Sequence, residues 1–126
     1  MIVRSSQRTV EPGAHGIPKE VILRAGVLPN VTRMAVASLK QGAAVEPHVH
    51  PTMYEIYFIL EGRAAHRLGA TEIDAGPGDF LIVPPATPHS LRVTGGPFRI
   101  FYRGLAGEAG RDALNSSAQP VSAASE

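Results

Sequence analysis

Two histidines and a glutamate lie close together near the middle of the chain, and their side chains are of the kinds that bind metal ions. In the stretch Gly42-Ala-Ala-Val-Glu-Pro-His48-Val-His50-Pro-Thr-Met-Tyr-Glu55, two imidazoles stand two residues apart and a carboxylate follows five residues after the second. On a β-strand, alternation puts His48 and His50 on the same face. The dipeptide Pro51-Thr52 predicts a turn, so the next strand can bring Glu55 back beside the pair. One hairpin is therefore expected to supply three ligands.

A fourth candidate ligand, His89, lies further along the chain in a proline-rich segment. Pro84, Pro85 and Pro88 precede it and favour an extended loop that presents His89 at the start of a strand. A sheet that closes on itself can bring this residue opposite the hairpin. Three neutral imidazoles and one carboxylate suit Fe(II), Mn(II), Co(II), Ni(II), Cu(II) or Zn(II), and they leave an octahedral ion open positions for substrate and water. Such an open site is typical of catalytic metal binding.

The spacing of these residues follows two motifs of a known family. The order Gly, five residues, His-x-His, four residues, Glu, six residues, Gly is met by Gly42, His48, His50, Glu55 and Gly62. The order Gly, five residues, Pro, four residues, His is met by Gly78, Pro84 and His89. Over residues 31–103 the chain thus resembles the cupin superfamily, which usually has Gly where this chain has Ala86 and Asn where it has Val93. The resemblance implies a small jelly-roll β-barrel with one divalent metal ion per chain, and it implies these four ligands: His48, His50, Glu55 and His89.

Glycine and proline punctuate the chain and set the expected fold class. The 126 residues include 13 Gly and 11 Pro, spread between short apolar stretches, which favours strands joined by turns over long helices. Strands are expected at residues 21–25, 31–40, 45–50, 54–60, 63–68, 71–74, 80–83, 90–93 and 98–103. The sequence therefore predicts an all-β fold, a single antiparallel β-barrel over residues 21–103. Residues 1–20 are expected to form an N-terminal arm, and residues 104–126 a short helix, at 106–115, with a tail.

The composition excludes several functional classes. Twelve Lys and Arg against eleven Asp and Glu give a formal net charge of +1, and the basic residues are scattered, so no nucleic-acid partner is expected. The absence of cysteine excludes a disulfide framework and a thiolate nucleophile. The longest apolar run covers residues 56–60, too short for a membrane span or a signal peptide, so a cytoplasmic protein is expected. The N-terminal arm has few apolar residues, and we expect it to pack on the barrel edge or on the second subunit of a homodimer.

Strand parity predicts which residues surround the metal. Tyr57 and Ile59 share the inward face of their strand with the glutamate ligand, and Leu91 shares that of the last histidine, so these three are expected to line the substrate pocket. The Tyr57 phenol can act in catalysis or contact the substrate, and it can equally be a packing residue. His66 and His15 fall outside the ligand pattern. They are expected to be a solvent-facing strand residue and a surface or interface group, respectively.

These features predict a metal-dependent enzyme that acts on a small organic molecule, with an Fe(II)-type dioxygenase favoured. An apolar pocket beside open coordination positions suits chemistry with dioxygen. An isomerase or lyase is the alternative, in which the metal is a Lewis acid and Tyr57 is the base. A non-enzymatic protein that binds or senses a small molecule also stays open, because the same site can hold a ligand without converting it.

Overall fold

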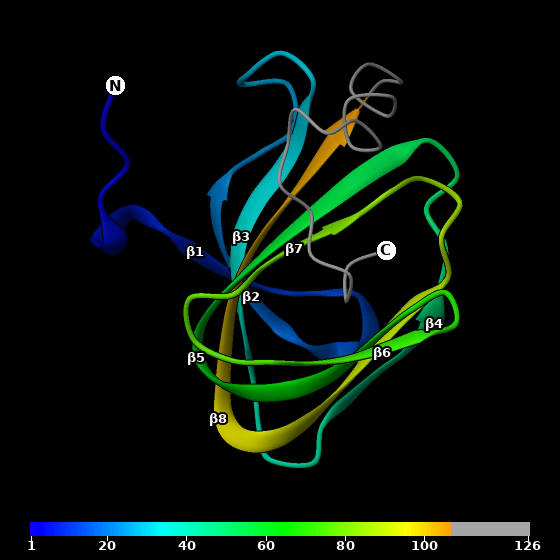
Figure 1. Ribbon diagram of the computed structural model, residues 1–126. Helices are drawn as coiled ribbons and strands as arrows, with labels where there is room; N and C mark the ends of the chain where they lie inside the picture. The colour runs from blue at the N-terminus through cyan, green and yellow to red at the C-terminus, as the bar shows by residue number, and fades with distance from the viewer. Residues whose placement is uncertain (107–126) are drawn as a thin grey trace.

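Eight β-strands and two short 3-10 helices make up residues 1–106, the part of the chain that the computed structural model describes (Figure 1). In chain order the elements are η1 (Ser5–Gln7), β1 (Thr9–Pro12), η2 (Ala14–Gly16), β2 (Pro18–Leu23), β3 (Val31–Leu39), β4 (Ala44–His48), β5 (Met53–Leu68), β6 (Thr71–Ala75), β7 (Phe80–Val83) and β8 (His89–Ala106). All the strand pairs are antiparallel, which confirms the predicted all-β class. Within residues 1–106 the pairing does not close into a complete ring, and no helix there is long and apolar enough to cross a membrane.

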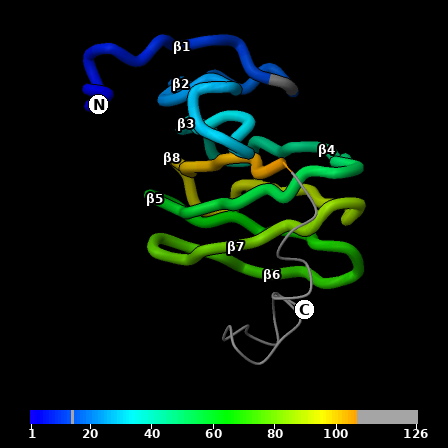
Figure 2. Tube along the Cα trace, turned by 90° about the horizontal axis from the view of Figure 1, so that it is seen from above, coloured from blue at the N-terminus to red at the C-terminus, as the bar shows by residue number. Residues whose placement is uncertain are grey.

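Two long strands, β5 and β8, run side by side and belong to both halves of the fold (Figure 1). The first half of β5 pairs with residues 99–106 of β8 and with β7, and β3, β2 and β1 extend this sheet in that order. The second half of β5 pairs with residues 89–95 of β8 and with β6, and β4 pairs with β8. Seen from above, the strands lie as successive layers, with β1, β2 and β3 on the side away from β6 (Figure 2).

Both long strands pass from one half to the other beside Gly62. The pairing register shifts three times between Ile59 and Ala64, and Gly62 has a φ of 81°. A Cβ atom at this position would collide with the carbonyl oxygens of Gly95 and Pro97. Glycine therefore permits both the bulge and the close approach of the two strands. The sequence predicts separate strands before and after Gly62, and before and after Gly95. In the structure each pair of predicted strands is one continuous strand, β5 or β8.

The core lies between the two halves and reaches the candidate metal ligands. Phe98 and Ile59 are its largest fully buried apolar side chains. Its other buried members come from five strands and are Ala37, Leu39, Tyr57, Ala64, Ala75, Leu81, Val83, Leu91, Val93 and Ile100. Burial of a large aliphatic or aromatic side chain stabilises the fold by about 1.5–3 kcal/mol, so this cluster fixes the strands that carry the site.

The N-terminal arm is ordered by strand pairing. Residues of β1 pair with β2, and β2 pairs with β3 in a register that sets Lys19 opposite Ala37 and Val21 opposite Ala35. The edge of the sheet is thus the partner of the arm, and backbone hydrogen bonds supply the order that its few apolar side chains cannot. At the other end, Ala106 closes β8. The rest of the predicted helix and tail, residues 107–126, lies outside the described residues.

Candidate metal centre

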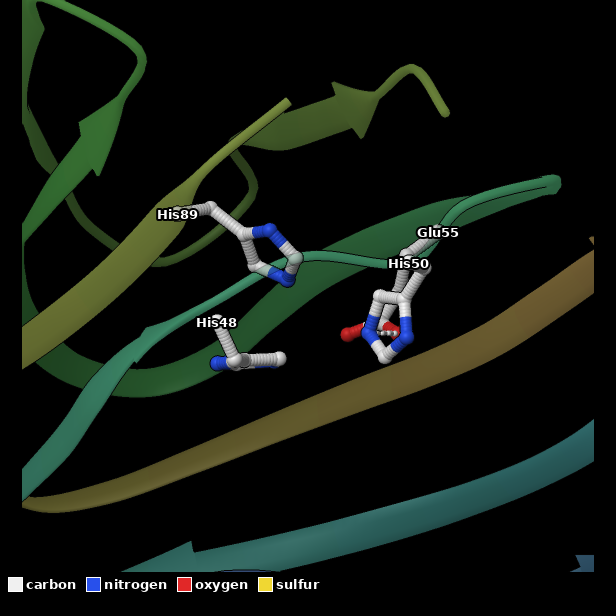
Figure 3. Close-up of side chains that lie close together, drawn as sticks. All are labelled: His48, His50, Glu55 and His89. Atoms are coloured by element: carbon white, nitrogen blue, oxygen red, sulfur yellow. Dashed lines mark ion pairs between the residues drawn. The ribbon is translucent and has the colours of Figure 1, made fainter. Parts of the chain in front are cut away.

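The four predicted ligands come together between β4, β5 and β8 (Figure 3). One ligand atom of each side chain lies within 4.8 Å of those of the other three. His48 ends β4 directly opposite His89, which begins β8, and their ring centroids are 4.1 Å apart. His50 follows in the loop after β4, and its ring centroid lies 5.1 Å from that of His89. Glu55, on β5, completes the group, so the hairpin and the distant histidine meet as the sequence predicts.

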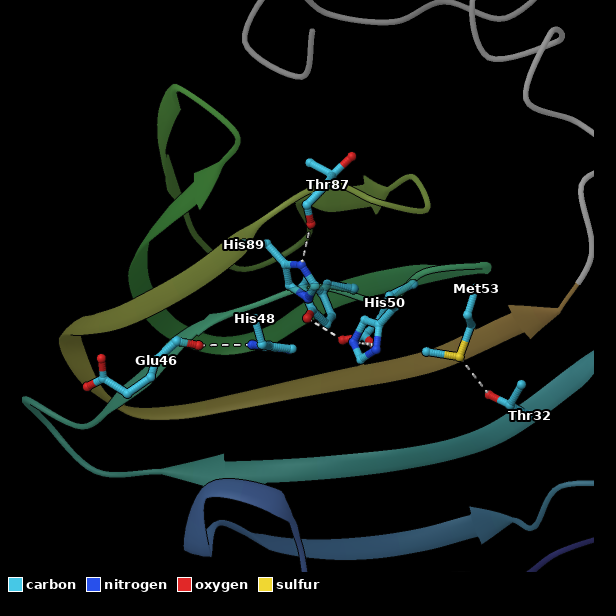
Figure 4. A network of polar contacts seen from close by, with 9 residues as sticks. Thr32, Glu46, His48, His50, Met53, Thr87 and His89 are labelled. Carbon is cyan, nitrogen blue, oxygen red and sulfur yellow. Dashed lines mark hydrogen bonds and ion pairs between the residues drawn. The ribbon is translucent and has the colours of Figure 1, made fainter.

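Backbone carbonyls fix the orientation of two of the imidazoles. The Nδ1 atom of His48 lies 2.9 Å from the carbonyl oxygen of Glu46, and the Nδ1 atom of His89 lies 2.9 Å from that of Thr87 (Figure 4). A carbonyl oxygen can only accept a hydrogen bond, so each Nδ1 carries the proton and donates it. The lone pair of each ring is then on Nε2. This arrangement is the usual outer support of a metal-binding histidine.

The polar atoms that face the centre lack partners, and a cation would satisfy them. The Nε2 atoms of His50 and His89 are buried and form no hydrogen bond within the described residues. His50 Nε2 lies 3.0 Å from Glu55 Oε2, but the contact does not have hydrogen-bond geometry. Burial lowers the pKa of His89 below its ordinary value, which keeps the imidazole neutral and able to donate its lone pair. The donor set of three imidazoles and one carboxylate therefore fits a divalent transition metal ion.

The loop before His89 is held by an unusual residue, Ala86. Its φ is 62°, in the left-handed region, and its backbone N–H donates a hydrogen bond of 2.7 Å to the carbonyl oxygen of His50. The loop is thereby tied to the segment that carries two of the other ligands. A residue with a Cβ atom pays about 1–2 kcal/mol for this conformation.

We expect Ala86→Gly to raise the free energy of unfolding by about 0.5–1 kcal/mol, because the relief of left-handed strain exceeds the added entropy of the unfolded chain. Chemical denaturation measures the change. Ala70→Gly is the matched control: Ala70 is also exposed and lies in a turn, but its φ is not positive. The control should lose stability, and an equal loss in Ala86→Gly would contradict the expectation.

A cavity of about 160 Å³ opens beside the cluster. His48, His50 and Glu55 line it from the metal side. Most of its remaining wall is apolar and is formed by Ile17, Ala37, Leu39, Val45, Leu91 and Ile100. Leu91 thus lies where strand parity predicts it. Tyr57 also lines the cavity, but Ile59 does not: it faces inward as predicted, yet it is fully buried in the core, deeper along β5.

Tyr57 contacts a candidate metal ligand directly. Its hydroxyl donates a hydrogen bond to Glu55 Oε1, which leaves the other carboxylate oxygen to face the histidines. Burial, followed by the negative charge of Glu55, raises the pKa of Tyr57 well above its ordinary value. The phenol therefore keeps its proton, orients the carboxylate and presents its hydroxyl beside the cavity.

His66 contradicts the sequence prediction of a solvent-facing residue. Only 1% of it is exposed, and its ring centroid lies 6.0 Å from that of Tyr57. Strict alternation from Ile59 would point position 66 outward. The register shifts around Gly62 reverse the parity, so that Ala64 and His66 both face the interior. Burial lowers the pKa of His66 to about 4, and its Nε2 atom has no hydrogen-bond partner within the described residues.

Three further polar residues line the cavity, and the sequence did not indicate any of them as a site residue. His15 is exposed, as predicted for a surface group, but its ring centroid lies only 5.0 Å from that of His48. Lys19 on β2 precedes both motifs in the sequence, and Tyr102 on β8 follows them. Tyr102 could have been found from strand alternation, because it lies two residues after Ile100 and so faces the same side of its strand. Nothing local marked His15 or Lys19, because β2 reaches the cavity only through its pairing with β3.

The fold is antiparallel β, and three histidines and one glutamate lie together beside an internal cavity. These features place the protein among small β-barrel proteins with a candidate metal centre. The sequence pattern described as the cupin domain matches residues 35–102, more than half of the chain. The chain therefore belongs to the cupin domain family, which confirms the resemblance drawn from its two motifs.

Relatives and solved structures agree with this assignment. The uncharacterized protein MJ1618 of Methanocaldococcus jannaschii is 34% identical over 79 residues, which are 59% of this chain and 63% of that protein, less than two thirds of its length. A predicted oxalate decarboxylase from Thermotoga maritima superposes with a TM-score of 0.77 at 23% identity, over 85% of this chain and 100% of that one. KdgF from Halomonas sp. gives a TM-score of 0.74 at 16% identity, over 86% and 96%. These structural similarities show a shared fold.

Proposed function

We propose that this protein is a metal-dependent cupin enzyme that acts on a small organic molecule. The observation that carries the proposal is the cluster of His48, His50, Glu55 and His89, whose ligand atoms lie within 4.8 Å of one another at the wall of a cavity. Two of its nitrogens are buried and have no hydrogen-bond partner within residues 1–106. A purely structural metal site is closed, whereas four ligands beside an open cavity leave room for a substrate.

Backbone carbonyls and Tyr57 orient the candidate metal ligands toward the position of a bound ion. A divalent ion held there would act as a Lewis acid toward a substrate oxygen, and a redox metal such as Fe(II) would also activate dioxygen. The backbone carbonyls of Glu46 and Thr87 hold two imidazoles in place, and Tyr57 holds the carboxylate. The apolar wall excludes water from the reacting groups.

Two reaction classes fit this arrangement. We favour an Fe(II)-type dioxygenase, because four ligands leave open positions and the apolar wall shields a reactive species from water. An isomerase or lyase is supported by a different observation, the Tyr57 hydroxyl at the cavity wall. The hydrogen bond of Tyr57 to Glu55 Oε1 places the phenol where it would move a proton to or from a bound substrate.

Turnover of small acids, alcohols and phenols by the Fe(II), Mn(II) and Zn(II) forms, in air and without oxygen, tests the proposal. A dioxygenase consumes oxygen, stops under anaerobic conditions and is inactive with redox-inert Zn(II). Equal turnover with and without oxygen, with part of it kept in the Zn(II) form, would establish the isomerase or lyase. Tight binding of a metabolite with no turnover in any form would favour a sensor over an enzyme.

Replacement of Tyr57 by phenylalanine separates chemistry from packing, because it removes the hydroxyl and keeps the ring. We expect turnover to fall roughly a hundredfold if the phenol transfers a proton, with metal content unchanged. The loss of its hydrogen bond should cost only about 1 kcal/mol of stability. Tyr54→Phe is the control, since Tyr54 is buried on the opposite face of β5 and does not line the cavity. Full activity of Tyr57→Phe would limit Tyr57 to packing.

The homodimer stays a prediction, and the surface of the sheet suggests where two copies would meet. Phe58, Leu60 and Phe80 are exposed on the outer face of β5 and beside it on β7. The rings of Phe58 and Phe80 are 6.5 Å apart between centroids. Clustered exposed apolar side chains are typical of an interface. Light scattering should give the mass of a dimer, and Phe80→Asp should shift it toward the monomer; a monomeric wild-type protein would contradict the prediction.

A further inference from the structure

We propose that the cavity binds the carboxylate of a small organic acid through Lys19 and Tyr102. This inference rests on the proposed function, since it names the substrate class of the same site. It arises from two polar groups that line the cavity without belonging to the metal cluster.

Lys19 brings a positive charge into the cavity wall. It lies on β2 opposite the small residue Ala37, which leaves space for its long side chain. Its Nζ atom stands 5.2 Å from the centre of the Tyr102 ring. Among residues 1–106, no carboxylate forms an ion pair with it. The neighbouring Glu20 lies instead beside Arg8 and Arg99.

Tyr102 adds a hydrogen-bond donor on the same wall. Its hydroxyl is buried and has no partner within the described residues. A buried hydroxyl without a partner is costly, because it has given up its bonds to water. An oxygen of a bound molecule would restore the bond. The Lys19 ammonium, which stands over the Tyr102 ring, and the Tyr102 hydroxyl both donate, and together they suit an anionic oxygen acceptor.

The N-terminal segment leaves space for the Lys19 side chain in this position. A Cβ atom at residue 13 would collide with Cε and Cδ of Lys19, so Gly13 leaves the room in which the lysine side chain lies. The same segment places His15 and Ile17 on the cavity wall. The predicted arm therefore completes the site as well as the sheet edge.

The charge and the size of the cavity define the class of ligand. Glu55 is the one carboxylate that lines it among the described residues, and that side chain belongs to the metal cluster. With a divalent ion bound, the cavity is positive and favours an anion. Its volume of about 160 Å³ is close to that of an apolar cavity that holds benzene, about 150 Å³. The apolar wall then takes the hydrocarbon part of a small monocarboxylic acid.

Titration calorimetry with matched probes tests the assignment. The Zn(II)-loaded protein is titrated with butyrate and benzoate, with their neutral amides, and with inorganic phosphate. We expect the acids to bind at least about tenfold more tightly than the amides. Lys19→Gln and Lys19→Met should each reduce that preference severalfold, and the bound ion should account for the preference that remains. Tyr102→Phe should weaken acid binding severalfold. Lys40→Gln is the control, because Lys40 is the other lysine of the chain, is exposed, and does not line the cavity.

The outcomes separate this proposal from the proposed function. Metal content is measured on every sample. If metal binds and the acids and amides bind equally, or if the Lys19 variants keep the full wild-type preference for acids, the anion site is overturned and the metal site stands. If no metal binds, the proposed function fails, and the same titrations of the metal-free protein decide the anion site. Phosphate binding as tight as that of the acids would overturn the assignment to an organic acid.

Discussion

Replacement of His89 by alanine should remove the metal and lower turnover by about a thousandfold, the loss expected when a metal's several kcal/mol of transition-state stabilisation disappears. His89 is the candidate ligand that comes from β8, while the other three come from the hairpin of β4 and β5. Its ring is buried and oriented by the Thr87 carbonyl, and the cluster within the described residues has only three other candidate ligands. Metal analysis of the purified variant measures the loss.

The same variant makes a test of metal binding that does not need a substrate. A metal present at about a hundred times its dissociation constant stabilises the native state by about 2.7 kcal/mol, so a chelator should lower the melting temperature of the wild-type protein by about 10 °C. His89→Ala should melt at the same temperature with and without chelator. His15→Ala is the control, since His15 lies near His48 but outside the four-ligand cluster. It should keep the full chelator shift. A wild-type protein that is indifferent to both chelator and added metal would refute the metal centre.

The candidate metal cluster could be predicted from the sequence because the positions of most of its members depend on local geometry. The turn between β4 and β5 brings Glu55 back beside His48, and His50 lies only two residues beyond the end of β4. Only His89 requires long-range pairing, and the motif spacing supplied it through the resemblance to a family. The left-handed Ala86 shows how strongly the fold imposes this loop, since the chain adopts the conformation there without the usual glycine.

The remainder of the site depends on features that the local sequence does not encode. Lys19 reaches the cavity only because β2 pairs with β3, and that pairing joins segments whose register no short motif reveals. Ile59 faces inward as predicted, but it lies in the core and does not line the cavity. Strand alternation predicts which face a side chain takes and does not predict how far along the strand the cavity extends. His66 fails in direction, because three register shifts in the bulge around Gly62 exchange the two faces of β5.

The burial of His66 leads to an expected dependence of stability on pH. The pKa of this imidazole is about 4 in the native protein against an ordinary value of 6.5. Between these two values the unfolded chain binds a proton that the native protein does not. The stabilising contribution of neutral His66 is therefore complete above about pH 6.5, and it falls as the pH is lowered toward 4, by about 1.4 kcal/mol per pH unit and about 3 kcal/mol in all.

Urea denaturation of the wild-type protein and of His66→Gln, between pH 4 and pH 7.5 and with chelator present throughout, isolates this contribution. Glutamine is polar and of similar size but does not titrate in this range, so its free energy of unfolding should fall less steeply with acid. The difference between the two profiles should approach about 3 kcal/mol at pH 4, because the two proteins differ only at residue 66. His15→Gln removes an exposed imidazole and should follow the wild-type curve. Parallel curves for the wild type and His66→Gln would mean that His66 binds a proton as readily in the native protein as in the unfolded chain, and the interior position of its side chain would then have to be abandoned.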